Sequence, residues 1–380
     1  MLEPLRLFQP SGLRLPRGLN LGRQRRSEAI HEKDLYHSSN RNRPMENTMP
    51  SVQCGRHRIH YELRGDPGRP VIVFLNGLTQ NARLWEDYAA YFVPRGYRVL
   101  AYDMLGQGRS SKPVIDIQLR HHAELLDSLL NRLELETVHL AGISFGGFVA
   151  LDFAIRYGHR LQSLTVMSTF AELTPQLEFL GAMLLQGLTE VGMPYLQQML
   201  YPMNMSSAWI DANRARIPSM MRNGYIGNDA YAMQNLMESF VELEPLTPGL
   251  SGIEVPTLIM NGEHDFFTPR ECHERIRKGI ENSRLLIIQQ AYHAFTIEKP
   301  AVTMRQLEVF LSQVTDGRWK GDQSVWVASD DPGAAQQWLP CIGDWMRAVQ
   351  FASPDATKSD AVVGLDSRHQ VHSQEGNDHD

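Results

Sequence analysis

Six short apolar runs, each ending near a glycine or a polar residue, recur along the chain. They are VIVFLNG (71–77), YRVLAYDM (97–104), VHLAGIS (138–144), LQSLTVMST (161–169), TLIMNGEHD (257–265) and LLIIQQA (285–291). A strand that is apolar on both faces is typical of a parallel sheet buried between helices. Segments with helical spacing lie between the runs, at 82–96, 115–135, 145–158, from about 270, and at 299–314. This alternation predicts an α/β fold with a mostly parallel central sheet flanked by helices, preceded by an antiparallel strand pair over residues 55–70.

The rest of the chain divides by composition. Residues 171–252 are too long for a loop and have a helical pattern, which predicts an inserted helical cap. Four of the six tryptophans fall in residues 319–351, so part of that segment is expected to pack on the core. The predicted organisation is a flexible N-terminal extension (1–48), a core (49–170 and 253–315), a helical cap (171–252), a Trp-rich segment (316–351) and a disordered tail (352–380).

Charge and cysteine content exclude several classes of protein. The formal net charge is −6 and no basic face is evident, so no nucleic-acid partner is expected. No apolar run approaches about 18 residues, so no membrane span is expected. Three widely spaced cysteines favour neither a disulfide framework nor a zinc site, and they fit a reducing, cytoplasmic compartment. The expected chemistry needs no cofactor and no metal.

The stretch GISFG (142–146) places Ser144 between two glycines where a predicted strand meets a predicted helix. This is the setting of a G-x-S-x-G nucleophile elbow, in which a tight turn presents the serine hydroxyl at a helix N-terminus. The alternative is a glycine-rich turn with an incidental serine. Ser110 and Ser111 lie in another loop, with no candidate base in its sequence.

A serine nucleophile needs a base and an orienting carboxylate, which follow in the order Ser, acid, His in this type of fold. Asp265 and His293 each come just after a predicted strand, at the same sheet edge as Ser144. Glu263 with His264 is an alternative pair, and Glu172 is the main alternative acid. We expect Ser144, Asp265 and His293 to form a catalytic triad.

Residues 55–314 resemble the α/β-hydrolase superfamily in four stretches: FLNGLTQNARLW, YDMLGQGRS, GISFGG and the NGEHDFFTP and AYHAF pair. The resemblance implies that Leu78 and Phe145 supply the backbone N–H groups of an oxyanion hole, and that Asp103 is structural. Asn76-Gly77 stands where relatives usually carry His-Gly. This loop is also similar to that of hydroxyacyl-carrier transacylases and rhamnolipid-precursor synthases, which tend to have Trp where this chain has Phe145.

Three functions follow from these residues. The first is a serine hydrolase that cleaves a carboxylic ester, lactone or thioester of a small molecule through an acyl-enzyme. The second is an acyltransferase that uses the same triad, and the third is a non-catalytic binding protein on the same scaffold. Nine methionines in the cap predict either an ordinary helix core or an apolar pocket over Ser144 for a hydrophobic acyl group.

Overall fold

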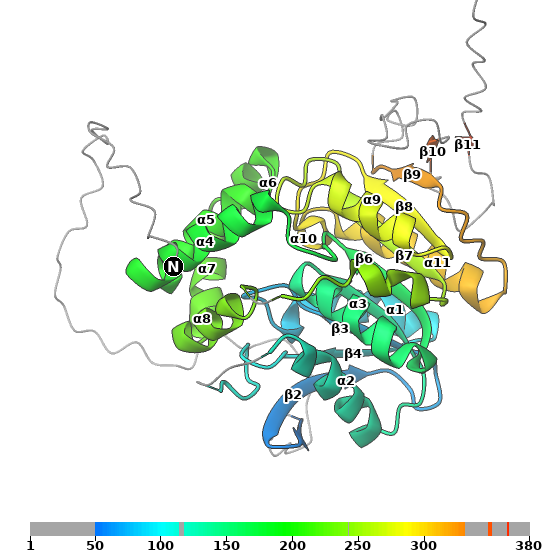
Figure 1. Ribbon diagram of the computed structural model, residues 1–380, viewed down its shortest axis with the longest axis horizontal. Coiled ribbons are helices and arrows are strands. Elements are labelled where there is room, and N and C mark those ends of the chain that lie inside the picture. Colours follow the sequence, from blue (N-terminus) through cyan, green and yellow to red (C-terminus); the bar gives the residue numbers. More distant parts are fainter. Residues whose placement is uncertain (1–49, 114–117, 242, 331–348, 352–362, 365–380) are drawn as a thin grey trace, which may run out of the picture. The chain divides into compact units, whose positions relative to one another are not determined.

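The computed structural model describes residues 50–113, 118–241, 243–330, 349–351 and 363–364. Over these residues the strands follow the order β1-β2-β4-β3-β5-β6-β7-β8-β9-β10-β11, with helices on both sides of the sheet (Figure 1). From β4 through β3 to β10 each neighbouring pair is parallel, whereas β1–β2, β2–β4 and β10–β11 are antiparallel. The predicted fold class is therefore confirmed, whereas the early antiparallel pair predicted over residues 55–70 is observed over residues 51–64.

The strands of the sheet fall at the six apolar runs of the sequence (β3 to β8) and at five further places (β1, β2, β9, β10 and β11). They are β1 (Ser51–Cys54), β2 (His57–Arg64), β3 (Val71–Leu75), β4 (Arg98–Tyr102), β5 (Val138–Ile143), β6 (Leu161–Met167), β7 (Thr257–Gly262), β8 (Ser283–Ile288), β9 (Val325–Ala328), β10 (Val349–Phe351) and β11 (Val363–Gly364).

Helices α1 to α3 and α9 to α11 flank the sheet (Figure 1), and helices α4 to α8 lie between β6 and β7 in the sequence. They are α1 (Glu86–Phe92), α2 (Arg120–Arg132), α3 (Phe145–Tyr157), α4 (Pro175–Glu190), α5 (Met193–Asn204), α6 (Ser207–Ala212), α7 (Ile217–Ile226), α8 (Ala230–Glu238), α9 (Arg270–Gly279), α10 (Phe295–Glu298) and α11 (Pro300–Thr315). None of the helices in the described part of the chain combines the length and apolar character needed to cross a bilayer.

Alternate residues of the central strands enter two different cores. In β3, Val73 packs in a cluster with residues of α2, α3 and α9, while Phe74 packs in a cluster with residues of α1 and α11. Successive side chains of a strand point to opposite faces, so a strand buried on both faces must be apolar throughout. This explains why the run VIVFL contains no polar residue and is completely buried.

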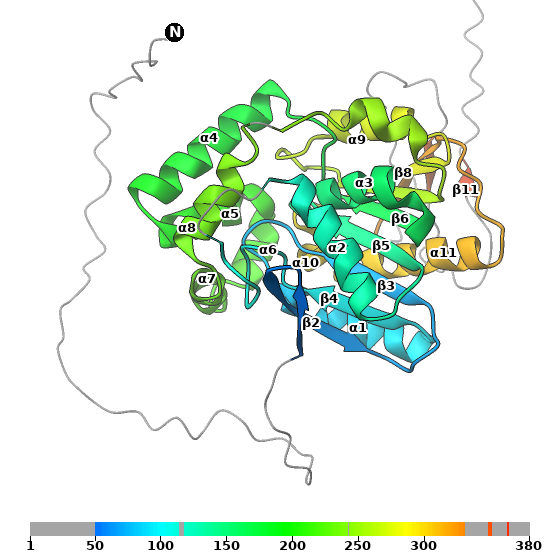
Figure 2. The same ribbon diagram turned by 60° about the horizontal axis from the view of Figure 1, so that its bottom comes forward.

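Helices α4 to α8 follow β6 and lie to one side of the sheet (Figures 1 and 2). They lie within residues 171–252, which we call the cap. The cap has an apolar cluster of its own, which includes Leu196, Met233 and Met237.

Four elements differ from the sequence-based expectation: helix α2 and strands β9, β10 and β11. Strands β10 and β11 were not predicted, and β11 lies inside the predicted disordered tail. The helix predicted over 115–135 is observed as α2, from Arg120 to Arg132, and its first turn is closed by bonds from the His121 and His122 amides to the carbonyls of Gln118 and Leu119. Residues 115–117 of the predicted helix lie outside the described residues. Strand β9 was not predicted, since VWVA is short and follows a polar stretch, yet it pairs in parallel with β8.

The Trp-rich segment contributes to the core in its described part. Trp319 packs edge-on against Phe310 of α11, with ring centroids 4.6 Å apart, and Trp326 packs on the same cluster. The other two tryptophans of the segment, the N-terminal extension and most of the predicted tail lie outside the described residues.

Among the described residues, the histidines His122, His139 and His273 are almost completely buried. Burial disfavours the charged imidazolium, and it lowers the pKa of His122 to about 3 and those of His139 and His273 to about 4. The ring of His273 has a partner on each nitrogen: its Nε2 accepts from the Thr169 amide (2.9 Å) and its Nδ1 donates to the Pro269 carbonyl (3.3 Å).

Candidate active site

Ser144 stands on a sharp turn between β5 and α3. Its backbone has φ 54° and ψ −119°, which is strained for a residue with a side chain. The turn is packed so tightly that a Cβ atom on Gly142 would lie 2.2 Å from the Gly146 carbonyl oxygen, and one on Gly146 would lie 2.6 Å from that of Asn76. Both positions must therefore be glycine, and the turn leads directly from strand β5 into helix α3.

Neighbouring strands hold this turn in place. The Ser144 amide donates to the Met167 carbonyl at the end of β6 (2.8 Å). The Ser144 carbonyl accepts from the Thr169 hydroxyl (2.7 Å), and Thr169 is in turn bonded to the buried His273. Sequence analysis missed Thr169 and His273, because their contacts join segments far apart in the chain and leave no local motif.

The structure brings Ser144, His293 and Asp265 together. His293 Nε2 lies 3.0 Å from Ser144 Oγ, and His293 Nδ1 lies 3.0 Å from both carboxylate oxygens of Asp265. A carboxylate only accepts hydrogen bonds, so Nδ1 carries the proton and Nε2 is left to accept from the serine hydroxyl. In this tautomer the imidazole can take a proton from Ser144.

Asp265 is fully buried and is held by several donors. Its oxygens accept from the Thr268 amide (2.9 Å), the Thr268 hydroxyl (2.8 Å) and the Asn261 side chain (3.3 Å). Burial by itself raises the pKa of Asp265, but the attraction to a protonated His293 and the hydrogen bond from its ring outweigh this, so the pKa lies below its ordinary value. Asp265 is therefore ionised where it faces His293.

The alternative acids are engaged elsewhere. Glu172 forms an ion pair with Arg275 and accepts from the Thr247 hydroxyl. Glu263 accepts from the Gln290 amide, and the neighbouring His264 ring is about half exposed. The structure thus places neither Glu172 nor the Glu263–His264 pair against His293.

The alternative serines are also engaged. The Ser110 hydroxyl donates to the Asp103 carbonyl and accepts from the His60 amide, while Ser111 accepts from the Arg58 amide. The Asp103 carboxylate accepts from the amides of Ala82 and Arg109, at 2.7 Å each. These bonds tie together the two loops after β3 and β4, and the predicted structural role of Asp103 is confirmed.

The loop after β3 lies directly beside Ser144. A Cβ on Gly77 would lie 3.5 Å from Ser144 Cβ, and Leu78 lines the cavity above the serine. Within the described part of the chain, the amides of Leu78 and Phe145 donate to no protein acceptor. Backbone donors that are fixed and unoccupied are what an oxyanion site requires.

Asn76, at the position of the departure from the usual His-Gly sequence, is held by two hydrogen bonds. Its side chain is completely buried, accepts from Trp85 Nε1 (3.1 Å) and donates to the Tyr102 carbonyl (3.2 Å). The side-chain amide of Asn76 therefore fixes the start of the loop to Trp85 and Tyr102.

Asn228, between α7 and α8, connects the cap to both core loops. Its Nδ2 donates to the Thr79 carbonyl (2.9 Å) and the Gly224 carbonyl (2.7 Å), and its Oδ1 accepts from the Gly108 amide (3.4 Å). Thr79 directly follows Leu78 and has a positive φ of 64°. No sequence pattern identified Asn228, because an isolated asparagine in a helical insertion carries no signal of its partners.

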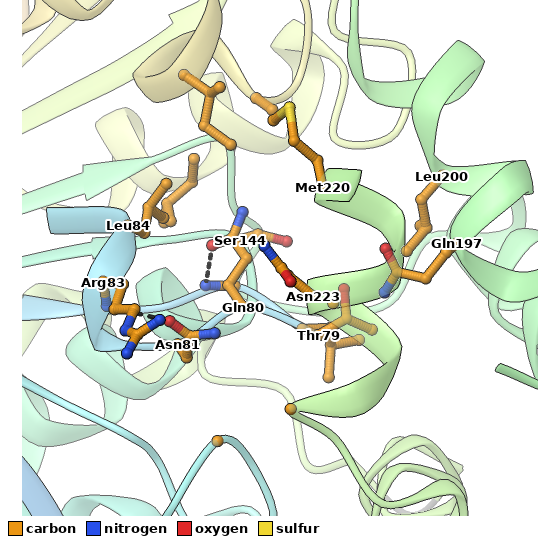
Figure 3. A pocket seen from close by; sticks show the side chains of 18 of the residues that line it. Thr79, Gln80, Asn81, Arg83, Leu84, Ser144, Gln197, Leu200, Met220 and Asn223 are labelled. Atoms are coloured by element: carbon orange, nitrogen blue, oxygen red, sulfur yellow. Dashed lines mark hydrogen bonds between the residues drawn. The ribbon is translucent and has the colours of Figure 1, made fainter. Parts of the chain in front are cut away.

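A cavity of about 740 Å³ lies over Ser144 and His293, between the core loops and the cap (Figure 3). Apolar side chains on its wall include Leu200, Met205 and Met220, whereas Met193 and Met233 are buried in the cap's own cluster. Some cap methionines therefore form an apolar cavity wall, such as Met205 and Met220, and others form ordinary helix core, such as Met193 and Met233. The cavity wall also carries amide side chains: Gln80, Asn81, Gln197, Asn204 and Asn223.

The chain is similar to several known hydrolases. A 2-hydroxy-6-oxononadienedioate/2-hydroxy-6-oxononatrienedioate hydrolase of Paraburkholderia xenovorans is 29% identical over 254 residues, covering 63% of this chain and 85% of that protein. The 3-oxoadipate enol-lactonase 2 of Acinetobacter baylyi is 24% identical over 258 residues, covering 67% and 93%. The crystal structure of the enol-lactonase from Burkholderia xenovorans has a TM-score of 0.64 at 22% identity, covers 69% of this chain and all of that chain, and shares the fold.

Both curated relatives are named for hydrolytic activities. The model of the α/β hydrolase fold family matches residues 70–300. Because this match spans more than half of the sequence, the chain belongs to the α/β hydrolase fold family.

Proposed function

We propose that the protein is a serine hydrolase in which Ser144 is the nucleophile, His293 the general base and Asp265 the residue that orients the base. The observation that carries this proposal is the His293 ring, which is bonded to Ser144 on one side and to Asp265 on the other at 3.0 Å. A serine hydroxyl is a weak nucleophile until an oriented base accepts its proton, and this arrangement meets that requirement.

The reaction proceeds in two halves. Ser144 Oγ attacks the substrate carbonyl carbon while His293 Nε2 takes the hydroxyl proton, which gives a tetrahedral oxyanion. The oxyanion collapses as the bond to the leaving group breaks, and the proton on His293 passes to that group. Water then attacks the acyl-enzyme with His293 again as base, and the released acid leaves Ser144 with its proton restored.

The developing negative charge is stabilised by fixed dipoles. The amides of Leu78 and Phe145 are the proposed donors, and the N-terminus of α3 points at the same place. Loss of one such donor typically reduces the rate by about 10²–10³. The bonds of Asn76 and Asn228 support this role, because they hold the loop that carries Leu78.

Hydrolysis and acyl transfer share the first half-reaction and differ in what attacks the acyl-enzyme. We favour hydrolysis because the curated relatives are named hydrolases and an enol-lactonase. Product analysis with a hydroxyacyl thioester separates the two, since only transfer gives a condensed ester and only hydrolysis gives the free acid.

Substitution of the nucleophile tests the proposal. Ser144→Ala should remove labelling by a fluorophosphonate probe and lower kcat for p-nitrophenyl esters by up to about 10⁶, as loss of a triad serine does in a protease. Ser219→Ala on the exposed side of α7 makes the same chemical change outside the cavity and should leave both properties intact. Near-normal labelling and turnover in Ser144→Ala would show that another residue is the nucleophile.

A further inference from the structure

The Gln80 side chain folds back onto the loop after β3, and its hydrogen bonds fix the orientation of its amide. Oε1 accepts from the Gly77 amide (2.8 Å), and the backbone amide of Gln80 donates to the Gly77 carbonyl (3.3 Å). A side-chain NH₂ group only donates, so the atom that faces the Gly77 N–H must be the oxygen. The nitrogen, Nε2, is therefore the branch of the amide that takes no part in this bond.

Nε2 of Gln80 is a donor that the described part of the protein leaves open to the cavity over Ser144. Among the described residues no acceptor receives its hydrogens, and the atom keeps solvent-accessible surface. Gln80 is half-buried and lines that cavity. Because Nε2 is accessible, water can hydrate it in the free enzyme and a substrate oxygen can pair with it when the cavity is filled.

Gln80 and Ser144 approach the same point from two different loops. A Cβ on Gly77 would lie 3.4 Å from Gln80 Cδ and 3.5 Å from Ser144 Cβ. The two side chains thus lie on one side of Gly77, and Figure 3 shows Gln80 beside Ser144. Gly77 directly precedes Leu78, whose amide is a proposed oxyanion donor. Nε2 is one bond away from Cδ, so it lies beside the place where a substrate carbonyl meets Ser144 Oγ.

The first acceptor that a bound ester brings to this place is its reacting carbonyl oxygen. When Ser144 attacks, negative charge develops on that oxygen, and a nearby donor then stabilises the transition state more than the bound substrate. The bond from the Gly77 amide holds the Gln80 amide in position before the substrate binds. The donor therefore needs no reorganisation during the reaction, which is the property that makes oxyanion donors effective.

We propose that Gln80 is a catalytic residue, and that its Nε2 donates a hydrogen bond to the oxyanion formed at Ser144. It is a side-chain donor that adds to the backbone amides of Leu78 and Phe145. The amide keeps both of its protons, so the proton transfers between Ser144 and His293 are unchanged. The proposal rests on the proposed function, because it takes Ser144 as the point of attack.

Two substitutions separate the donor from the loop contact. Gln80→Met has a similar length and removes both the donor and the acceptor for the Gly77 amide. Gln80→Glu keeps an acceptor for that amide but has no donor, and its charge repels the oxyanion. With p-nitrophenyl butyrate, Gln80→Met should lower kcat about 10–100-fold, because two donors remain, and should change KM much less. Gln80→Glu should lower kcat at least as far.

Two control variants accompany these substitutions. Gln186→Met makes the same change at an exposed position of cap helix α4 and should leave kcat at the wild-type value. Asn81→Asp controls for charge, because it adds a carboxylate to the cavity wall and keeps the acceptor for the Arg83 amide. Its loss of kcat should be much smaller than that of Gln80→Glu, and an equal loss would count against the proposal.

The ranking of the two Gln80 variants decides between a donor and a loop support. If Gln80 only holds the loop, Gln80→Glu keeps the bond to Gly77 and should retain more activity than Gln80→Met. That ranking would overturn the proposal. Gln80→Glu should also melt close to the wild-type temperature, because the loop bond is kept, so a loss of kcat in this variant does not come from unfolding.

A trifluoromethyl ketone gives a readout that a structural role would not change. Such a ketone forms a tetrahedral adduct with the Ser144 hydroxyl, and the former carbonyl oxygen carries the negative charge. In a ¹H–¹⁵N spectrum one Nε2 proton of Gln80 should move downfield when the adduct forms, because hydrogen bonds to charged oxygens are short and strong. The signal is identified by its absence in Gln80→Met. An Nε2 signal that does not move would overturn the proposal.

The Ser144→Ala variant separates this proposal from the proposed function. If Ser144→Ala keeps its turnover and its probe labelling, the proposed function fails, and the oxyanion at Ser144 fails with it. If Ser144→Ala is inactive while Gln80→Met and Gln80→Glu keep the wild-type kcat, the proposed function stands and only the role of Gln80 is wrong.

Discussion

Asn228→Ala removes the side chain that joins the cap to the oxyanion loop. The change deletes two short hydrogen bonds from Nδ2, to Thr79 and Gly224, and one longer bond from the Gly108 amide. A buried hydrogen bond contributes about 0.5–1.5 kcal/mol net, and a 3.4 Å bond contributes little, so the free energy of unfolding should fall by roughly 2–3 kcal/mol.

The same change should slow the chemical step. Thr79 is bonded to Leu78, whose amide is a proposed oxyanion donor, so a loosened loop misplaces that donor. The ceiling is the loss of one donor, about 10²–10³ in rate, and a partial displacement should lower kcat by about 10–100-fold. KM should change much less, because the oxyanion forms only after substrate has bound.

Urea unfolding and steady-state kinetics on a p-nitrophenyl ester measure both effects. Asn235→Ala is the matched control, because Asn235 also donates from the cap to a core loop, but through a single bond of 3.5 Å to the Pro113 carbonyl. It should cost well under 1 kcal/mol and leave kcat near the wild-type value. Asn228→Asp keeps an acceptor for Gly108 but cannot donate to Thr79, so its kcat should fall like that of the alanine variant. A destabilised Asn228→Ala with normal kcat would refute the link to the oxyanion loop.

Three further predictions concern the acid, the buried histidines and the last core strand. Asp265→Asn should lower kcat by about 10⁴, because the correct tautomer of the His293 imidazole is lost, whereas Glu172→Gln should change kcat little. A larger loss of kcat in Glu172→Gln than in Asp265→Asn would identify Glu172 as the orienting acid. The three buried histidines have pKa values of about 3–4 in the folded chain and about 6.5 in the unfolded chain, so below pH 6.5 the unfolded chain binds more protons. The free energy of unfolding should therefore fall as the pH is lowered toward 4, by about 1.4 kcal/mol per histidine per pH unit. Equal stability to urea at pH 7 and pH 5 would contradict this. A chain that ends at residue 315 lacks β9 and the Trp319 contact, and the edge of β8 is exposed. It should melt at a lower temperature and aggregate more than a chain that ends at residue 330. Equal melting curves would show that β9 contributes little to stability.

Local sequence pattern predicted the sheet and the placement of the candidate triad because both depend on features of adjacent residues. A strand such as β3 is apolar throughout because both faces are covered, and Gly142 and Gly146 are required by the turn around Ser144. Asp265 and His293 were found because parallel strands end at a common edge.

The remaining features depend on contacts between distant segments, which leave no local pattern. Asn228 resembles any polar residue of a helical insertion until its partners are seen. Strand β9 was missed because four residues are too few to show a periodicity. The apolar pocket expected from the cap methionines accounts for only part of the cavity wall, since the amides come from several separate segments.

The position of the cap in the chain has a consequence for how the enzyme folds. Residues 168–256 separate β6 from β7, which pair in parallel, whereas only residues 263–282 separate β7 from β8. Closing a chain segment about four times longer costs about 1 kcal/mol more in entropy before any contact compensates for it. Ser144 lies on one side of the β6–β7 junction, and Asp265 and His293 lie on the other. Non-local strand pairing of this kind slows folding, so during refolding secondary structure should return before Ser144 becomes reactive.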